Sequence, residues 1–183
     1  RHHGRHVLDG RQGLARLGQR HLFGTALKDE EIDLMFQDVI KALETLAQDK
    51  HGAMIAVEKN DPLSGYIGSG VAIDARVSSE LLQAIFTPNN PLHDGSVIIQ
   101  HGRITSAGCI FALTQKQDLS RIFGMRHRAA LGLSEETDAL IFIVSEERQD
   151  ISLVYQNKLY KDIMREELLA KAKEFLLKEK TDE

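Results

Sequence analysis

Apolar residues recur at three- and four-residue spacing from Ile32 to Ala47, and this periodicity predicts an amphipathic helix of about five turns. The acidic residues Asp29, Glu30 and Glu31 come just before it, where the positive end of a helix dipole stabilises negative charge. A helix with a single apolar face must pack against another apolar element. The other apolar segments are short, since the longest uninterrupted apolar run is the six residues from Ala139 to Val144. Runs of this length suit buried strands and cannot span a bilayer.

Strand and helix patterns alternate along the rest of the chain. The predicted strands are residues 53–57, 66–73, 96–100, 104–113, 139–144 and 151–155. The predicted helices after the first are residues 78–86, 126–135 and a last helix with Met164, Leu168, Ala172 and Phe175 on one stripe. His101 and Gly102 form a tight turn between two of the strands. We therefore predict an α/β fold, a single domain with a mixed, twisted central sheet flanked by helices.

Composition narrows the classes of function. The chain has 183 residues, with Lys+Arg 23 against Asp+Glu 27, and this balance argues against a general nucleic-acid-binding groove. The single cysteine excludes a disulfide scaffold and a cysteine-rich zinc site, and it suits a reducing cytoplasm. Residues 1–24 are basic and glycine-containing, so we expect a flexible or loosely docked lead-in before a domain of residues 25–183.

The first candidate for chemistry is the segment Asn-Asn-Pro-Leu-His-Asp-Gly-Ser, residues 89–96. A proline-stiffened loop there presents Asp94 at the start of an apolar strand, and Gly95 leaves room for a ligand to approach the backbone. Carboxylate oxygens are preferred ligands of Mg²⁺, which also binds substrate phosphates. An ordinary Asp-Gly turn explains the same residues, so the segment alone leaves both interpretations open.

The second candidate is Arg126-His127-Arg128 at a predicted helix start. Arginines are disfavoured there by the helix dipole unless an anion neutralises them. The exposed N–H groups of a helix N-terminus bind anions, and guanidinium groups strengthen a phosphate site. The alternative is a solvated basic turn without a ligand.

The third candidate is Ser145-Glu146-Glu147, directly after the apolar run that ends at Val144. Ends of strands are favoured ligand sites in α/β sheets, and one of the glutamates is a candidate to complete a metal site. An ordinary charged turn is the alternative. Together, the three segments predict a domain that handles a metal and phosphates, as phosphoryl or nucleotidyl transfer requires.

Two of these segments also resemble a known family. The sequences PLHDGSVII, residues 91–99, and GMRHRAALGLSE, residues 124–135, resemble the diadenylate cyclase domain, and the resemblance extends over roughly residues 28–163. That family joins two ATP molecules into cyclic di-AMP and releases two pyrophosphates. The chain is most similar to its bacterial membrane-anchored subfamily. This implies a cytoplasmic domain tethered to the cell membrane by a segment that precedes residues 1–24.

The resemblance also implies roles for individual residues. The implied catalytic residues are Asp94, Gly95, Arg126, His127 and Arg128, with Asp94 activating the ribose 3′-hydroxyl and the Arg-His-Arg motif holding the phosphates. The implied ligands of a divalent metal, Mg or Mn, are Asp94, His93 and Glu147. The implied ATP-binding residues are Gly95, Ser96, Ile110, Phe111, Leu113, Met125, Arg126, His127, Arg128, Ser145 and Glu147.

Two residues depart from the family pattern. Ser96 replaces an alanine, and Met125 replaces a threonine before the Arg-His-Arg motif. A thioether is a poor substitute for a hydroxyl that bonds phosphate, so Met125 predicts an altered phosphate contact or reduced activity.

The implied reaction needs two identical attacks, which two chains facing each other about a two-fold axis arrange most simply. We therefore expect a catalytic homodimer with ATP as its substrate. Two alternatives remain open: a non-catalytic ATP-binding relative of the cyclases, and a metal-dependent phosphodiesterase that uses His93, Asp94 and a glutamate.

Overall fold

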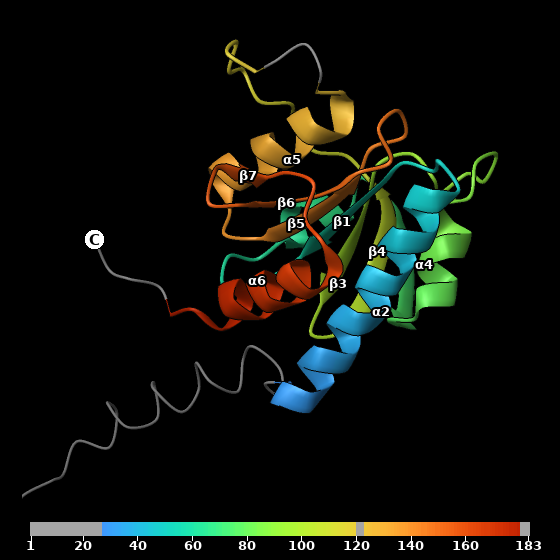
Figure 1. Cartoon of the computed structure of the whole chain (residues 1–183), viewed down its shortest axis with the longest axis vertical. Helices are drawn as coiled ribbons and strands as arrows, with labels where there is room; N and C mark the ends of the chain where they lie inside the picture. Colours follow the sequence, from blue (N-terminus) through green and yellow to red (C-terminus); the bar gives the residue numbers. More distant parts are fainter. Residues whose placement is uncertain (1–26, 120–122, 180–183) are drawn as a thin grey trace, which may run out of the picture.

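The computed structural model describes residues 27–119 and 123–179, which fold around a seven-stranded sheet in the order β2-β4-β3-β1-β5-β6-β7 (Figure 1). The strands are β1 Ala53–Val57, β2 Val71–Arg76, β3 Ser96–Gln100, β4 Arg103–Cys109, β5 Leu140–Val144, β6 Ile151–Tyr155 and β7 Lys158–Tyr160. β1 and β3 are parallel, and the other neighbouring strands are antiparallel. The predicted α/β fold with a mixed central sheet is confirmed.

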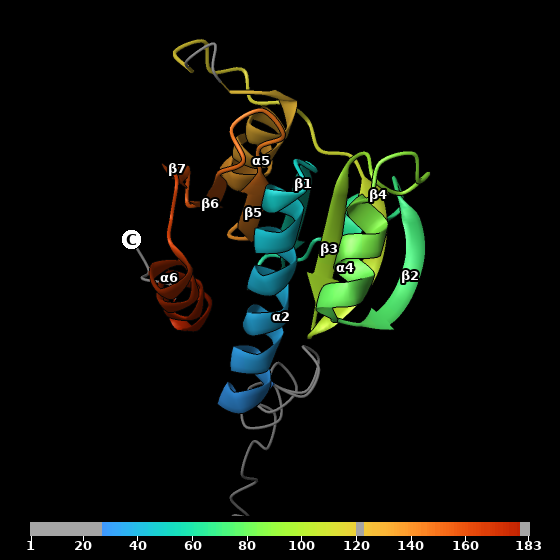
Figure 2. The same ribbon diagram turned by 45° about the vertical axis from the view of Figure 1, so that its right-hand side comes forward.

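Helices cover both faces of this sheet. On one face, α2 (Asp29–Gln48) lies between α4 (Ser79–Phe86) and α6 (Arg165–Leu177), as Figure 2 shows. The single-turn α3 (Ser64–Ile67) and α5 (Met125–Glu136) pack on the opposite face. The predicted first helix is therefore α2, and its apolar stripe packs on the sheet as its periodicity required.

The central strands β1 and β5 are buried on both faces, which explains their continuous apolar sequences. Alternate side chains of each strand belong to the two different apolar clusters. Phe142 of β5 contacts Phe36 of α2, with 6.0 Å between the ring centroids. Met54 and Ile143 instead face the layer that contains α5. Helices of both layers therefore pack against these two strands.

The predicted helix 78–86 and the predicted last helix form as α4 and α6, whereas the predicted strand 66–73 differs. Ser78 caps α4, because its Oγ accepts a hydrogen bond from the Leu81 N–H at 3.1 Å. The predicted last helix is α6, although Met164 is its exposed N-cap and not part of the buried stripe. The predicted strand 66–73 does not form as one element. Ser69 donates its hydroxyl to the Tyr66 carbonyl at 2.7 Å, which closes a turn after α3, and β2 starts only at Val71.

The predicted strand 104–113 is also shorter, because β4 ends at Cys109. The following residues leave the sheet and run across α5, where the Thr114 N–H donates to the Arg128 carbonyl at 3.0 Å. β7 was not predicted. It forms because Gln156 and Asn157 adopt positive φ angles of 49° and 62°, which turn the chain tightly back onto β6.

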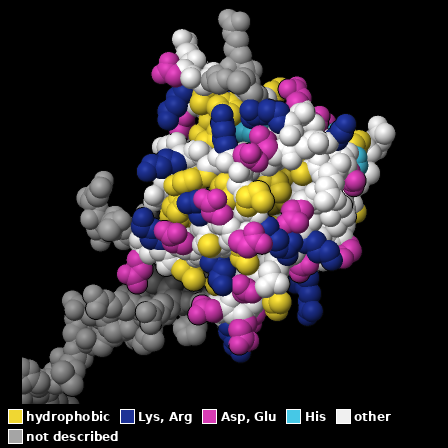
Figure 3. Space-filling view, viewed as in Figure 1, with side chains coloured by type: hydrophobic (Ala, Val, Ile, Leu, Met, Phe, Trp, Pro, Cys, Tyr) yellow, Lys and Arg dark blue, Asp and Glu magenta, His cyan; other side chains and the backbone are white. Residues whose placement is uncertain are grey.

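Within the described ranges, no helix has the length and apolar character needed to cross a membrane. Acidic and basic side chains are interspersed with apolar ones on the face drawn in Figure 3. The predicted boundary between residues 24 and 25 lies outside the described residues.

Candidate active site

The topology of the sheet brings the three candidate segments to one edge. Asp94 and Gly95 precede β3, and β1 runs parallel to β3, so both strands begin at this edge. β4 and β5 run the opposite way and therefore end there. The pairing of Ser96 with Cys109 and of Ala53 with Val144 fixes this alignment. The polar residues that follow β5 consequently lie near the loop that precedes β3.

A cavity of about 540 Å³ opens at this edge of the sheet, and the first turn of α5 forms part of its wall. This volume lies within the ordinary range of small-molecule sites. The residues that line it are Met54, Asp94, Gly95, Cys109, Ile110, Phe111, Leu113, Gly124, Met125, Arg126, His127, Ala129, Val144, Ser145, Glu146 and Glu147. Polar and charged groups therefore share the cavity with an apolar wall.

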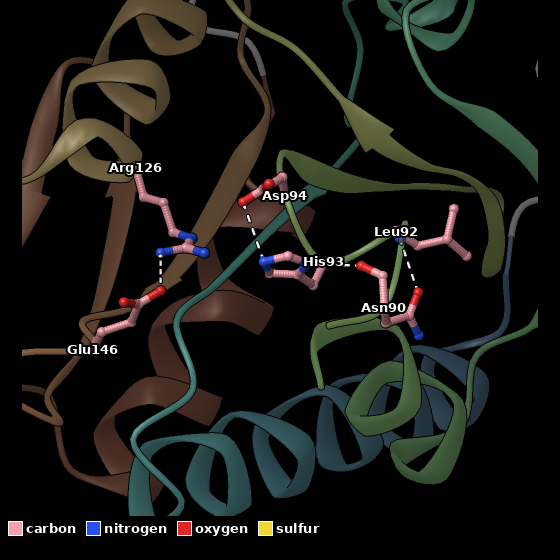
Figure 4. A network of polar contacts seen from close by, with 6 residues as sticks. All are labelled: Asn90, Leu92, His93, Asp94, Arg126 and Glu146. Carbon is pink, nitrogen blue, oxygen red and sulfur yellow. Dashed lines mark hydrogen bonds and ion pairs between the residues drawn. The ribbon is translucent and has the colours of Figure 1, made fainter. Parts of the chain in front are cut away.

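The loop before β3 holds His93 and Asp94 side by side. Asn90 organises this loop, because its Oδ1 accepts from the Leu92 N–H at 2.8 Å and its amide donates to the Ala84 carbonyl of α4 at 2.9 Å. The Asn90 carbonyl lies 2.6 Å from His93 Nδ1, and His93 Nε2 lies 3.4 Å from Asp94 Oδ1 (Figure 4). The Asp94 side chain is 87% exposed, so its carboxylate is open to a ligand.

Gly95 is required by the packing of this loop against the end of β4. Its φ angle is +86°, a conformation that residues with a side chain rarely adopt. A Cβ atom at this position would lie 2.6 Å from the Cys109 carbonyl oxygen. The glycine therefore serves the backbone geometry that presents Asp94, in addition to any contact with a ligand.

Arg126 of α5 reaches back across the cavity to the segment after β5. Its Nη1 donates to Glu146 Oε1 at 2.8 Å, and Figure 4 shows this pair opposite His93 and Asp94. α5 starts at Met125 after Gly124, with no side chain capping its first N–H groups. An uncapped helix start beside an arginine is the arrangement expected of a phosphate site.

His127 follows Arg126 but is buried, with only 4% of its surface exposed. Its ring lies against Phe123, with 5.2 Å between the centroids. Burial lowers the pKa of His127; Asp150 raises it, and the charges of Arg148, Lys161 and Arg126 lower it further. The imidazole is therefore held in its neutral form and does not add a positive charge to the cavity.

Most of the predicted ATP-binding residues line the cavity, but Ser96 and Arg128 do not, and neither does the predicted metal ligand His93. Ser96 is buried, and its hydroxyl donates to the Met54 carbonyl at 3.1 Å. The roles predicted for all of these residues remain predictions. The sequence reasoning gave no site role to several lining residues, namely Met54, Cys109, Gly124, Ala129 and Val144, while Glu146, one of the two candidate glutamates, also lines the cavity. Most are apolar core or glycine positions that carry no chemical signal in a sequence.

The donor atoms at the cavity suit a divalent cation only in part. The Asn90 carbonyl can only accept, so its contact with His93 assigns a proton to Nδ1, and a neutral imidazole then presents the Nε2 lone pair next to Asp94 Oδ1. A histidine nitrogen and a carboxylate in this relation fit a metal that also binds substrate phosphates. Across residues 27–119 and 123–179, no three His, Cys, Asp or Glu side chains are grouped to hold a metal by themselves. Glu147 thus does not form a three-ligand site with the other two.

Residues 40–159 match the model of the DAC family, described as DisA bacterial checkpoint controller nucleotide-binding. The chain belongs to the DAC family. Its relatives include a diadenylate cyclase of Listeria monocytogenes, which is 40% identical over 161 residues, 86% of this chain and 59% of the relative. Cyclic di-AMP synthase CdaA of Bacillus subtilis is 37% identical over the same shares. The DAC chain thus spans 59% of the length of these curated relatives.

Solved structures agree with this membership. DacA from Staphylococcus aureus matches the DAC chain with a TM-score of 0.78 and 42% identity, covering 83% of this chain and 100% of that one. A hypothetical membrane spanning protein from Bacillus cereus matches with a TM-score of 0.69 and 37% identity, covering 84% and 72%. The single mixed α/β domain is therefore a fold that this chain shares with these two proteins.

Proposed function

We propose that this DAC domain is a diadenylate cyclase, which condenses two ATP molecules into cyclic di-AMP and releases two pyrophosphates. The observation that carries the proposal is the shared cavity: Asp94 and Arg126 line one nucleotide-sized space at the edge of the sheet. The names of the relatives, diadenylate cyclase and cyclic di-AMP synthase, support the same reaction. A carboxylate for a hydroxyl and a guanidinium for phosphates are the groups that nucleotidyl transfer needs.

In the proposed reaction, the ribose 3′-oxygen of one ATP attacks the α-phosphorus of the other. The new bond is a 3′–5′ phosphodiester, the bond to the pyrophosphate breaks, and the hydroxyl proton is lost. The exposed Asp94 carboxylate positions that hydroxyl and accepts its proton as a general base. Arg126 and the uncapped N–H groups of α5 neutralise the phosphate oxygens. The second attack repeats these events and closes the ring.

A divalent metal, Mg²⁺ or Mn²⁺, fits His93 Nε2 and the Asp94 carboxylate, and Glu147 lines the same cavity as Asp94 without joining them in a three-ligand group. When bound there, it would neutralise phosphate charge and lower the pKa of the attacking hydroxyl. The absence of a three-ligand group in the described residues agrees with a metal that depends on substrate phosphates for its remaining ligands.

We propose that the catalytic unit is a dimer with one ATP in each chain. Two equivalent attacks require two equivalent sites that face each other. Apolar side chains surround the mouth of the cavity, and Ile110 and Met125 are 70% and 72% exposed. A facing chain or the adenine of its nucleotide would cover this apolar rim. Met125 lies in this rim, at the position where the family has a threonine. We still expect this replacement to alter a phosphate contact.

We also propose that the full-length protein is tethered to the membrane, with this domain on the cytoplasmic side. The similarity to the Bacillus cereus protein described as membrane spanning supports this proposal. Fractionation of cells that produce the full-length protein tests it: the domain should sediment with membranes and be accessible to protease only from the cytoplasmic side.

Incubation of the purified chain with ATP and Mg²⁺ or Mn²⁺, followed by mass spectrometry of the products, tests the proposed reaction. We expect cyclic di-AMP and pyrophosphate, and no product in excess chelator. Asp94→Asn should keep the fold and lower turnover by at least about 100-fold, as loss of a group that acts on the reacting atoms typically does.

Other products would support the alternatives. ATP binding without turnover indicates a non-catalytic relative, and hydrolysis to a linear or mononucleotide product indicates a phosphodiesterase. Asp94→Asn with unchanged turnover would remove Asp94 from the mechanism.

A further inference from the structure

Glu146 and Gly52 lie beside Arg126 and have no role in the reaction described above. Glu146 follows β5, and its Oε1 accepts from Arg126 Nη1 at 2.8 Å. Gly52 is buried at the turn that enters β1, next to the guanidinium. The two residues come from segments almost a hundred residues apart and meet at one side chain. Their common feature is that both limit where the Arg126 guanidinium can lie.

The contact with Gly52 is steric and close. A Cβ atom at Gly52 would lie 2.3 Å from Arg126 Nη1 and 2.6 Å from Arg126 Cζ. The same atom would lie 2.6 Å from Cγ of Glu146. Any side chain at position 52 would therefore displace the arginine, the glutamate or both. The absent side chain is what allows the guanidinium to lie this close to the backbone before β1.

The contact with Glu146 is polar and leaves most of the guanidinium free. Arg126 has five N–H donors, and Glu146 accepts from Nη1. Arg126 Nε is buried and has no hydrogen-bond partner among the described residues, so the stem of the side chain is enclosed. The Arg126 side chain is 23% exposed, and it lines the cavity. Because Nε is enclosed, only the Nη donors that Glu146 does not take remain for a phosphate in that cavity.

We propose that Gly52 and Glu146 are positioning residues, which hold the Arg126 guanidinium in one orientation toward the phosphates of ATP. This inference rests on the proposed cyclase function. An arginine has a long, flexible side chain, and fixing it before the substrate binds lowers the entropy lost in the transition state. Glu146 acts through its hydrogen-bond acceptor rather than its charge, because a negative charge beside phosphates opposes their binding.

Four single variants separate this role from a general effect on folding. Gly52→Ala adds one methyl group under the guanidinium, and Gly65→Ala is its matched control because no atom lies within 4 Å of a Cβ at Gly65. Glu146→Ala removes the acceptor of the Arg126 hydrogen bond. Glu146→Gln keeps a carbonyl acceptor and removes the charge.

Steady-state kinetics of cyclic di-AMP formation should separate these variants. We expect Gly52→Ala and Glu146→Ala each to lower kcat by about 10- to 100-fold, as small displacements of catalytic groups do, with KM changed by less than about three-fold. Glu146→Gln should restore kcat to within about three-fold of the wild type, and Gly65→Ala should match the wild type. The double variant Gly52→Ala with Glu146→Ala should be no worse than either single variant, because both disturb the same side chain.

A second measurement does not depend on turnover. In a nitrogen-15 correlation spectrum, the buried Arg126 Nε–H should give a slowly exchanging signal, assigned by its loss in Arg126→Lys. Gly52→Ala and Glu146→Ala should abolish that slow exchange, while Glu146→Gln and Gly65→Ala should keep it. Retention of both kcat and the protected signal in Gly52→Ala or Glu146→Ala would overturn the positioning role. Equal losses in Glu146→Gln and Glu146→Ala would overturn the part assigned to the hydrogen bond.

The two proposals fail in different ways. If the wild-type chain forms no cyclic di-AMP, the proposed function is wrong, and the Nε–H signals still decide whether Gly52 and Glu146 hold Arg126. If the wild type is active and the variants are unchanged in kinetics and in spectrum, only the positioning role is wrong.

Discussion

The imidazole of His127 lies under the first turn of α5, where it packs against Phe123. Lys161 Nζ makes a cation–π contact with the same Phe123 ring, 4.3 Å from its centroid. Burial and the neighbouring cations favour the neutral imidazole, although Asp150 opposes them. In a motif that we propose holds phosphates, the central histidine thus supports the helix start with its ring, and the positive charge at the cavity comes from Arg126.

The lowered pKa of His127 predicts a loss of stability in mild acid. In the unfolded chain this histidine binds a proton below about pH 6.5, whereas the folded chain resists protonation until a lower pH. The unfolded state therefore binds more protons in that window, and the free energy of unfolding falls as the pH drops. The limiting slope from one such group is ~1.4 kcal/mol per pH unit.

Urea denaturation measures this slope when it is repeated at pH values from about 7.5 to about 5, in steps of about half a unit. His127→Phe keeps a ring against Phe123 and removes the titrating group, so its stability should depend less on pH over this window. A wild-type slope in His127→Phe would show that burial of this histidine is not its cause.

Single residues differ in how far their roles can be predicted from the sequence. Arg126 stands out because an arginine at a helix start is disfavoured without an anion, and Asp94 stands out as a carboxylate beside a glycine at the start of an apolar strand. Gly52 gives no such signal, because its requirement comes from a guanidinium 74 positions away in the chain, a contact that only the fold creates. Ser96 follows the motif in sequence, but strand alternation turns its hydroxyl into the core and toward the Met54 carbonyl.

At the scale of elements, the segment after β4 is attached to α5 as a strap, defined here as residues 110–114. The Thr114 N–H donates to the Arg128 carbonyl at 3.0 Å, and its hydroxyl donates to Glu135. Gly132 allows the closest approach, since a Cβ atom there would lie 1.9 Å from the Ala112 carbonyl oxygen. The strap carries the apolar wall of the cavity, so its seat on α5 determines the shape of that wall.

Gly132→Ala should therefore destabilise the protein, although alanine normally favours a helix interior by about 1 kcal/mol over glycine. The new methyl group overlaps backbone atoms of the strap, and such overpacking costs about 1–3 kcal/mol. The midpoint of urea denaturation measures the change, and ATP affinity should fall as the strap moves. Gly65→Ala, in the open turn α3, should stay within about 0.5 kcal/mol of the wild type. Equal stability of the two variants would show that the strap yields without cost.

Periodicity predicted well the elements that are buried on all sides or that bury a single face. α2 has a single apolar stripe, and β1 and β5 are apolar throughout, so their sequences reflect their surroundings directly. α3 and β7 are four and three residues long, too short to show a period. The strap was predicted as part of a strand because it is rich in apolar residues. Its apolar side chains line the cavity, however, and do not pack in the sheet.

At the scale of the whole molecule, the chain offers one set of groups for a reaction that needs two. Asp94 and Arg126 lie on the same cavity, so one chain can hold one ATP by its phosphates and present that ATP's 3′-hydroxyl. In the proposed dimer, the attacked α-phosphorus would then belong to the ATP of the facing chain. Each bond would thus depend on Asp94 of one chain and Arg126 of the other, and the two bonds would use opposite pairs.

This division predicts the product of mixed dimers. Asp94→Asn and Arg126→Ala should each be inactive alone, because both attacks then lack the same group. A dimer with one chain of each kind keeps one intact pair, Asp94 of the second chain with Arg126 of the first, while the opposite pair lacks both groups. At saturating ATP it should form one phosphodiester bond and release one pyrophosphate, which gives a linear dinucleotide. Cyclic di-AMP should stay below about one hundredth of the wild-type yield.

The two variants are mixed in equal amounts, unfolded together and refolded so that they exchange chains. Mass spectrometry of the products then distinguishes the possible arrangements. Each variant treated in the same way by itself is the control, and wild-type chains taken through refolding show that activity is recovered. A linear product in the mixture alone supports one Asp94 and one Arg126 acting across the interface. Full cyclic product would mean that one intact set of groups makes both bonds. No product from the mixture, with recovered wild-type activity, would mean that Asp94 and Arg126 of the same chain serve the same bond.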